Sequence, residues 1–507
     1  MKETPTGNAA PTGGRRVVRN SIFNTAGWAV NALLVIFSIP YFVARLSVSG
    51  YGVYALLVGL VGYYGLLDLG LGQGVVKFVA EFRVRNDAGG ISRSINAALW
   101  VQILSGLIGS ALLFFFTKDL LHLLKVPPEL WADGQSGIHA VAIGFFFTMM
   151  SGTFSSALQG LQRYDLTARV NVIASVLLTG ALVLLLRLGC GLREMIWATA
   201  LSAVLTSLAF LIIMKRKIPE WRFFERVEKE SFRSIFAFSG FMFISRVSNI
   251  FCNYLVTLII GLFLGPAVVT LYVVPWKLVS SVGAFLGSAF GVLFPYASEL
   301  AALGDGQKIK RTFVDASKLF AALSIPLNLT LFIFSRSILR VWMGRSFSDA
   351  AWLVLSLLAM MSLLGSLSVV PNLITMGLGF SRIVGQFSLL TLLFYTALLP
   401  LFTWQWGAIG SAWGLLVSLI PGLSLVVYEI KKIFKINLAH YFSQVLGFHS
   451  GFVIAAAAGV ALFRSPLLSL PALMGAAAVF LGSYFGLLSL FHMAPIRDLI
   501  RNMKSTS

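Results

Sequence analysis

The sequence predicts an all-α polytopic membrane protein of about fourteen transmembrane helices, and three observations lead to this fold class. Of the 507 residues, 58% are hydrophobic and 11% are charged, whereas soluble domains carry about 25% charged residues. The mean hydropathy is +0.87, and many apolar runs reach about 20 residues, the length of a helix that crosses a bilayer. The runs do not alternate with period two, which excludes a membrane barrel of strands.

The predicted spans are joined by short loops, and the charges in these loops predict their orientation. We place the spans at residues 20–44, 52–76, 94–116, 136–158, 167–187, 194–214, 235–264, 267–297, 319–335, 350–374, 383–403, 406–428, 446–463 and 470–491. With the N-terminus inside, 28 of the 39 Lys and Arg residues fall on the cytoplasmic side. This positive-inside bias predicts that both termini are cytoplasmic. The same clustering between apolar runs accounts for the net charge of +20 without a nucleic-acid partner.

Weak matches between the two parts of the chain predict an internal duplication. The segment around Glu81 resembles that around Glu299, and Gly160 in QGLQR resembles Gly377 in MGLGFSR, at offsets of 218 and 217 residues. Two six-helix halves inserted the same way round form a parallel repeat, and transporters built in this way bind substrate between the halves. The alternative is two bundles that simply pack together. The predicted division is a disordered cytoplasmic N-tail (1–19), an N-terminal six-helix half (20–214), a cytoplasmic linker (215–234), a C-terminal six-helix half (235–428), and two extra helices with a cytoplasmic C-tail (429–507).

Three charged residues lie deep inside predicted spans, away from the span ends: Asp68, Arg246 and Lys277. A charge at the centre of a membrane helix costs about 2.5–3.5 kcal/mol, so each is expected to face a wet cavity or a partner. Arg246 and Lys277 predict a cationic cavity that suits an anionic group such as a phosphate or diphosphate. The alternative is a structural ion pair, for example of Asp68 with Lys77 or Arg246. For Asp68, a coupling role and a structural role both stay open.

Four further polar residues in the spans are Asn24, Asn31, Asn249 and Asn253. They hydrate the cavity or bond one helix to another, and we favour helix bonding.

The sequence shows no enzymatic constellation. The G-x-G-x-G run at residues 70–74 follows a membrane helix, whereas a dinucleotide loop needs a strand before it and a βαβ unit around it. Catalytic motifs of hydrolases, kinases and metalloproteases are missing, and Cys190 and Cys252 lack metal-ligand spacing. We therefore expect no enzymatic activity, no cofactor and no metal site.

The run YGVYALLVGLVGYYGLLDLGLGQGVVKFVAE, with the segment LQGLQRYDL, carries a family resemblance. It resembles the polysaccharide (O-antigen type) flippases of the multidrug/oligosaccharidyl-lipid/polysaccharide exporter superfamily, over about residues 15–435. The matching residues are Asn24, Gly27, Tyr51-Gly52, Asp68-Leu69-Gly70-Leu71, Gly160, Arg163 and Asp165.

This resemblance implies a MATE-like fold and a function in the bacterial cytoplasmic membrane. The implied function is translocation of an undecaprenyl-diphosphate-linked oligosaccharide to the outer leaflet by alternating access. It also implies contact with membrane lipid, coupling to H⁺ or Na⁺ or to the membrane potential, and other polysaccharide-assembly membrane proteins as partners. The related lipid II flippases are arginine-rich in their first span, whereas this span is uncharged before Arg45, which disfavours lipid II as substrate.

Two other functions remain as alternatives. A drug or organic-cation antiporter of the same superfamily should hold acidic residues in its cavity, but this chain has more cations than anions within its spans. A membrane polysaccharide polymerase or ligase needs a sizeable outer loop or a catalytic acidic motif, and the predicted outer loops are too short for it.

Overall fold

The computed structural model describes residues 13–62, 67–68, 70–223, 254–291, 293–447, 449 and 469–486, and every element in these ranges is helical. Within them, nine helices are long and apolar enough to cross a membrane, and two shorter apolar helices cover Tyr254–Leu264 and Leu470–Gly486. The protein is therefore an all-helical polytopic membrane protein. The predicted number of fourteen spans is not confirmed over these ranges.

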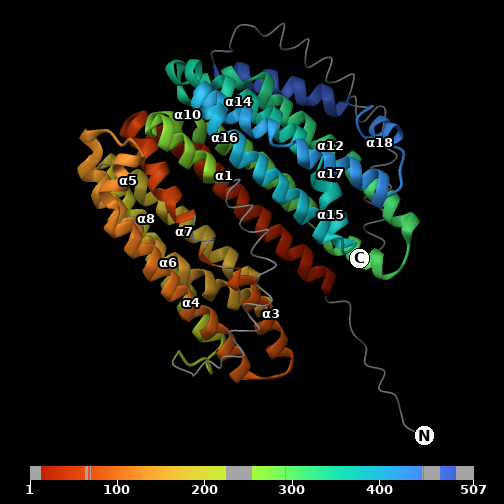
Figure 1. The fold of residues 1–507 in the computed structure, drawn as a ribbon, viewed down its shortest axis with the longest axis horizontal. Helices are drawn as coiled ribbons and strands as arrows, with labels where there is room; N and C mark the ends of the chain where they lie inside the picture. The colour runs from red at the N-terminus through yellow and green to blue at the C-terminus, as the bar shows by residue number, and fades with distance from the viewer. Residues whose placement is uncertain are drawn as a thin grey trace.

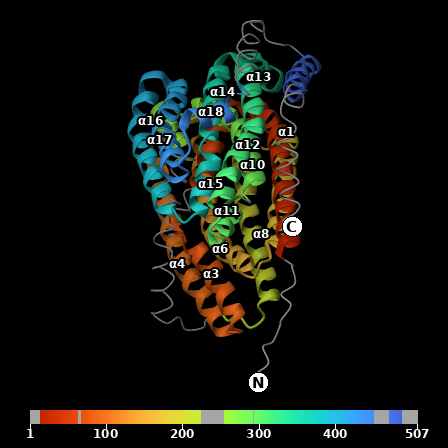
Figure 2. The same ribbon diagram turned by 90° about the vertical axis from the view of Figure 1, so that its right-hand side faces the viewer.

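The helices form two groups, with α1 between them (Figure 1). Besides α1 (Gly13–Gly62), the first group contains α3 (Leu71–Val84), α4 (Ala88–Phe115), α5 (Thr117–Leu123), η1 (Pro128–Leu130), α6 (Trp131–Gly160), α7 (Tyr164–Arg187) and α8 (Leu192–Lys217). The second contains α10 (Pro266–Phe290), α11 (Leu293–Ala302), α12 (Gly306–Ile333), α13 (Ser335–Met343), α14 (Arg345–Ser366), α15 (Val369–Gly377), α16 (Ser381–Val417), α17 (Ile420–Tyr428), η2 (Glu429–Ile433) and α18 (Leu438–Val445). Figure 2 shows the second group from the side that carries α11, α15 and α18.

The long helices run side by side from one end of the molecule to the other (Figure 1). We call the end that carries α5 the α5 end, and the opposite end, which carries α3 and α18, the α3 end. Because α12 begins beside α18 and continues to α13, the short helices α5 and α13 belong to the same end.

The breaks between helices recur at a constant spacing along the chain. Five pairs of residues with positive φ are separated by 217 to 219 residues: Ser47 with Gly265, Asn86 with Gly304, Lys125 with Gly344, Gln162 with Gly379, and Gly189 with Gly407. Helices α4 and α12 begin and end 218 residues apart, and each starts with an aspartate side chain, Asp87 or Asp305, that accepts a hydrogen bond from the backbone. These repeated breaks support the predicted duplication.

A close helix contact also recurs in the two groups. A Cβ atom on Gly160 would lie 2.8 Å from Cβ of Val79, so α6 approaches α3 closely. On Gly377, a Cβ atom would lie 2.7 Å from Cβ of Ala297, so α15 approaches α11 in the same way. Glycine at these two positions lets the backbones approach closely, as is common in membrane helices.

The buried apolar residues form three clusters, and each cluster contains residues from a different set of helices. One cluster combines both groups near the α5 end, and includes Leu121 of α5 and Leu339 of α13. A second contains residues of α10, α11, α12, α15, α17, η2 and α18 with Phe434 and Tyr484. A third contains only residues of α3, α4, α6, α8 and the segment after α8. Over the described part of the chain, the two groups thus share one core at the α5 end and have separate cores at the α3 end.

Several predicted spans have different boundaries in the structure, and two of them show why. The predicted span 52–76 is interrupted, because Asp68 lies in a turn and Gly70 has a left-handed φ of 74° before α3 begins. The predicted span 319–335 starts much earlier, at Gly306. The first turns of α12 are amphipathic, with Phe313 buried and Lys310 exposed, so hydropathy alone places the start of this helix too late.

Candidate functional site

Lys277 is the in-span cation that the structure describes. It lies on α10, two residues after Pro275. Its side chain is exposed. Within the described ranges, no Asp or Glu lies at ion-pair distance from its ammonium group. This position therefore offers a positive charge that no neighbouring carboxylate balances there.

Lys277 lies near the end of the part of α10 that belongs to the shared core. Val274 and Val279, which precede and follow it in the sequence, belong to the cluster that both groups share. Further along α10, Leu286 and Phe290 belong to the cluster of the second group alone. Lys277 thus lies within one turn of Val279, the last buried residue of α10 in the shared core.

Between the two groups, the shared core is closed by direct backbone contact of α1 with α10. The Thr270 hydroxyl donates a hydrogen bond of 2.6 Å to the carbonyl of Val48. One turn further along α1, a Cβ atom on Gly52 would lie only 1.9 Å from the carbonyl oxygen of Pro266. Glycine at residue 52 is thus required for this contact, which we call the α1–α10 seal.

Two further hydrogen bonds connect the groups across the sequence. Pro40 has no N–H, so the carbonyl of Ile36 has no partner within α1. Trp342 of α13 donates to this carbonyl through Nε1, at 2.7 Å. The ammonium of Lys125 donates to the carbonyl of Phe263 at 2.8 Å. Each bond uses a helical carbonyl as acceptor, so together they fix the two groups against one another.

Asp68 is buried within the first group. It is 2% exposed, and its Oδ1 accepts a hydrogen bond from Nε2 of Gln102 on α4, which is 1% exposed. No ion pair joins it to Lys277 in the described structure. The structure therefore does not bring these two predicted site residues together.

Of the remaining predicted site residues, the structure describes Asn24 and Asn31. Asn24 lies in α1, and Asn31 lies in the same helix with a half-buried side chain. Arg246, Asn249 and Asn253 lie outside the described residues, so their predicted roles stay predictions.

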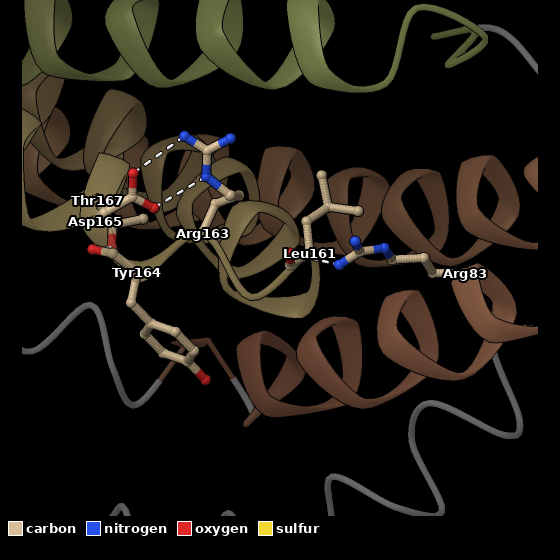
Figure 3. Close-up of polar contacts among 6 residues, drawn as sticks. All are labelled: Arg83, Leu161, Arg163, Tyr164, Asp165 and Thr167. Carbon is tan, nitrogen blue, oxygen red and sulfur yellow. Dashed lines mark hydrogen bonds and ion pairs between the residues drawn. The ribbon is translucent and has the colours of Figure 1, made fainter. Parts of the chain in front are cut away.

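A polar network fixes the turn between α6 and α7 (Figure 3). Arg163 donates from Nε and Nη2 to the two carboxylate oxygens of Asp165, at 2.9 and 3.0 Å. These bonds raise the pKa of the Arg163 guanidinium, which stays charged. Arg83 at the end of α3 donates to the carbonyl of Leu161 at 2.6 Å. The turn is thus bonded to α3, in the same region as the close contact at Gly160.

Replacing Asp165 by Asn removes the bidentate pairing and is expected to loosen this turn. Because the pair is partly exposed, the cost should stay below about 1 kcal/mol. Hydrogen–deuterium exchange of residues 161–167 should become up to about fivefold faster. Exchange at the wild-type rate would show that the pair does not hold the turn.

One buried carboxylate was missed in the sequence. Glu429 is fully buried and opens the single π-helical turn η2, a feature frequently found at functional sites. The hydroxyl of Thr375 on α15 faces it, yet both carboxylate oxygens lack a donor at hydrogen-bond distance among the described residues. The available signal was a lone acidic residue at the end of the apolar run 406–428. Buried carboxylates in membrane helices mark ion or proton pathways.

The fold defines a class of protein: an all-helical membrane bundle of two groups of helices, with Lys277 near the end of the core that they share. The structure is similar to the lipid II flippase MurJ in an inward closed conformation, with a TM-score of 0.72 and 14% identity over 95% of this chain and 100% of that chain. It is also similar to an inward-facing MATE family multidrug transporter of the MOP superfamily, with a TM-score of 0.64 and 15% identity over 82% of this chain and 99% of that chain. At these identities the likeness concerns the fold alone.

The sequence comparisons define the family. Residues 42–352 match the family described as polysaccharide biosynthesis protein, and the chain belongs to this family. A Shigella flexneri protein described as an O-antigen transporter is 23% identical over 409 residues, which cover 80% of this chain and 95% of that protein. A Haloferax volcanii protein described as a low-salt glycan biosynthesis flippase is 24% identical over 335 residues, 66% of each chain. The predicted family resemblance is thereby confirmed.

Proposed function

We propose that this protein is a flippase that carries an undecaprenyl-diphosphate-linked oligosaccharide across the cytoplasmic membrane for polysaccharide biosynthesis. The observation that carries this proposal is Lys277, an exposed cation without a described acidic partner near the end of the shared core. A cation there suits a diphosphate headgroup, and the relatives named above are described as an O-antigen transporter and a glycan flippase.

The proposed mechanism is alternating access between two six-helix halves, residues 20–214 and 235–428. The positive-inside bias supports a cytoplasmic location of the α3 end. In this orientation the separate cores at the α3 end permit entry from the inner leaflet, and the α1–α10 seal closes the outer side. Opening of the seal, with closure at the α3 end, would then release the headgroup to the outer leaflet.

The positive charge of Lys277 argues against an antiporter for organic cations. An antiporter for organic cations gains nothing from an exposed lysine at the junction of the halves, because like charges repel. Lipid II is disfavoured by the uncharged first span, and the structural likeness to MurJ concerns the fold alone.

The test of the proposed function is the leaflet in which the lipid-linked oligosaccharide accumulates. In cells that lack this protein, the oligosaccharide should collect on the cytoplasmic leaflet and be protected from a lectin added outside spheroplasts. A plasmid copy of the wild-type gene should restore labelling by the lectin. Normal labelling in cells without the protein, and without any second transporter of this family, would refute the proposal.

Glu429 is our candidate for coupling to H⁺ or Na⁺. Replacing it by Gln preserves its shape but removes the charge, so the translocation rate should no longer respond to an imposed ion gradient. The matched control is Glu299→Gln, which removes an exposed carboxylate on α11. If Glu429→Gln responds to both gradients as the wild type does, Glu429 has no role in coupling.

A further inference from the structure

A cavity of about 290 Å³ lies between α12 and α18 at the α3 end. It is separate from the α1–α10 seal and from Lys277. It is lined by Lys310, Arg311, Val314, Asp315, Lys318, Ile436, His440 and Gln444.

The polar lining comes from two helical stripes. Lys310, Val314 and Lys318 follow one another at intervals of four residues, so they lie on one face of α12. On α18, His440 and Gln444 are also four residues apart, and their Nε2 atoms are 2.9 Å from one another. The two stripes line the same cavity, so the side chains of both helices converge on it.

Aromatic packing holds the two walls in place. The ring of Phe313 on α12 stacks on Phe434 with 3.9 Å between ring centroids, and on Tyr441 of α18 with 5.1 Å. The side chain of Asn437 accepts a hydrogen bond of 3.2 Å from the backbone of His440 and so caps α18. The cavity is therefore bounded by packed helices.

The cavity carries a net positive charge. Of its three cations, Arg311 is paired with Asp315 at 3.7 Å. Lys310 and Lys318 have no acidic partner at ion-pair distance in the described ranges. Two ammonium groups beside an amide and an imidazole make an arrangement that recognises a phosphate group.

The corresponding place in the first group of helices is built differently. At the offset of 218 residues, Ser92 and Trp100 of α4 occupy the positions of Lys310 and Lys318. The segment after α8 packs on this face: Phe223 lies 6.0 Å from Trp100, between ring centroids.

Hydrogen bonds secure that segment against α4. The indole of Trp221 donates to Oδ1 of Asn96 at 2.9 Å, and Nδ2 of Asn96 donates to the carbonyl of Arg222 at 2.7 Å. In the first group this face is thus covered by aromatic rings, whereas in the second it surrounds a cationic cavity. The duplicated helix pattern does not by itself require these cations.

We propose that this cavity binds the phosphate group of an anionic lipid at the membrane surface. Basic pockets between membrane helices on the cytoplasmic side suit anionic lipid headgroups, and the first turns of α12, a candidate span, line this cavity. The lipid phosphate has two sources, an anionic glycerophospholipid of the bilayer or a polyprenyl diphosphate. Binding of the first kind is independent of the proposed transport function.

The test is lipid binding by the purified full-length protein, measured by native mass spectrometry. The probes are phosphatidylglycerol, phosphatidylcholine, undecaprenyl diphosphate and inorganic phosphate. The double variant Lys310→Gln/Lys318→Gln should bind phosphatidylglycerol or undecaprenyl diphosphate about thirtyfold more weakly, since each interfacial cation contributes to binding of an anionic lipid. Phosphatidylcholine binding should not change. Whichever of the two anionic probes loses affinity identifies the source of the phosphate.

The matched control is Lys308→Gln/Lys431→Gln, which removes the same charge from exposed positions that do not line the cavity. It should bind both anionic lipids within about threefold of the wild type. The variant Lys310→Arg/Lys318→Arg keeps the charge and should retain binding. Equal losses in the control and the cavity variant, or binding of inorganic phosphate alone, would overturn the proposal. Either result leaves the leaflet test of the proposed function unaffected.

Discussion

Replacing Lys277 by Gln is expected to abolish polysaccharide export while the protein reaches the membrane in normal amounts. The substitution removes the exposed cation near the end of the shared core but keeps a side chain of similar length. A hydrogen bond to a charged group contributes about 1.5–3 kcal/mol, so the translocation rate at low substrate should fall by roughly ten- to a hundredfold. The measurement is surface polysaccharide in cells that express only the variant.

Two controls separate the charge of Lys277 from its packing. Lys277→Arg keeps the positive charge and should retain a substantial part of export. Lys308→Gln removes an exposed lysine of α12 and should leave export unchanged. Full export by Lys277→Gln would show that this cation does not take part in binding the headgroup.

Replacing Gly52 by Val should prevent formation of the α1–α10 seal. Any Cβ at this position meets the carbonyl of Pro266, so α1 and α10 have to move apart. Overpacking of this kind costs about 1–3 kcal/mol, and the branched side chain of Val is stiff in a helix. We expect a lower Tm of the purified protein and loss of export.

Gly59 offers the matched control for Gly52 on the same helix. A Cβ atom at Gly59 meets nothing within 4 Å, so Gly59→Val makes the same chemical change without the collision. It should keep export and change Tm much less than Gly52→Val does. Equal behaviour of the two variants would mean that the contact of Gly52 with α10 does not limit transport.

Span composition predicts the fold class because a bilayer imposes strong limits on sequence. The predicted span 94–116 corresponds to α4 (Ala88–Phe115), and the predicted span 167–187 to α7 (Tyr164–Arg187). Such helices need long apolar runs, since backbone polar groups must be bonded internally in lipid. Helix α12 was predicted too short because its first turns bury one face and expose lysines on the other.

The details of the site depend on tertiary contacts that hydropathy does not encode. Asp68 was predicted inside a helix, but it lies in a turn whose form depends on the left-handed Gly70 and is buried by Gln102 of another helix. Burial of Glu429 depends on packing of α15 and α18 around η2. By contrast, Lys277 can be recognised from the sequence. The free-energy cost of a charged side chain in an apolar span follows from the span itself and needs no knowledge of tertiary contacts.

The central claim, that this chain moves a lipid-linked oligosaccharide between leaflets, is tested most directly in proteoliposomes. The purified protein is reconstituted with a fluorescently labelled undecaprenyl-diphosphate oligosaccharide, and a membrane-impermeant quencher reports the fraction in the outer leaflet over time. We expect rapid exchange between leaflets with the wild-type protein, slow exchange with Lys277→Gln, and none in protein-free vesicles. Exchange that is no faster with the wild-type protein than in protein-free vesicles, under every imposed ion gradient and membrane potential, would contradict this claim.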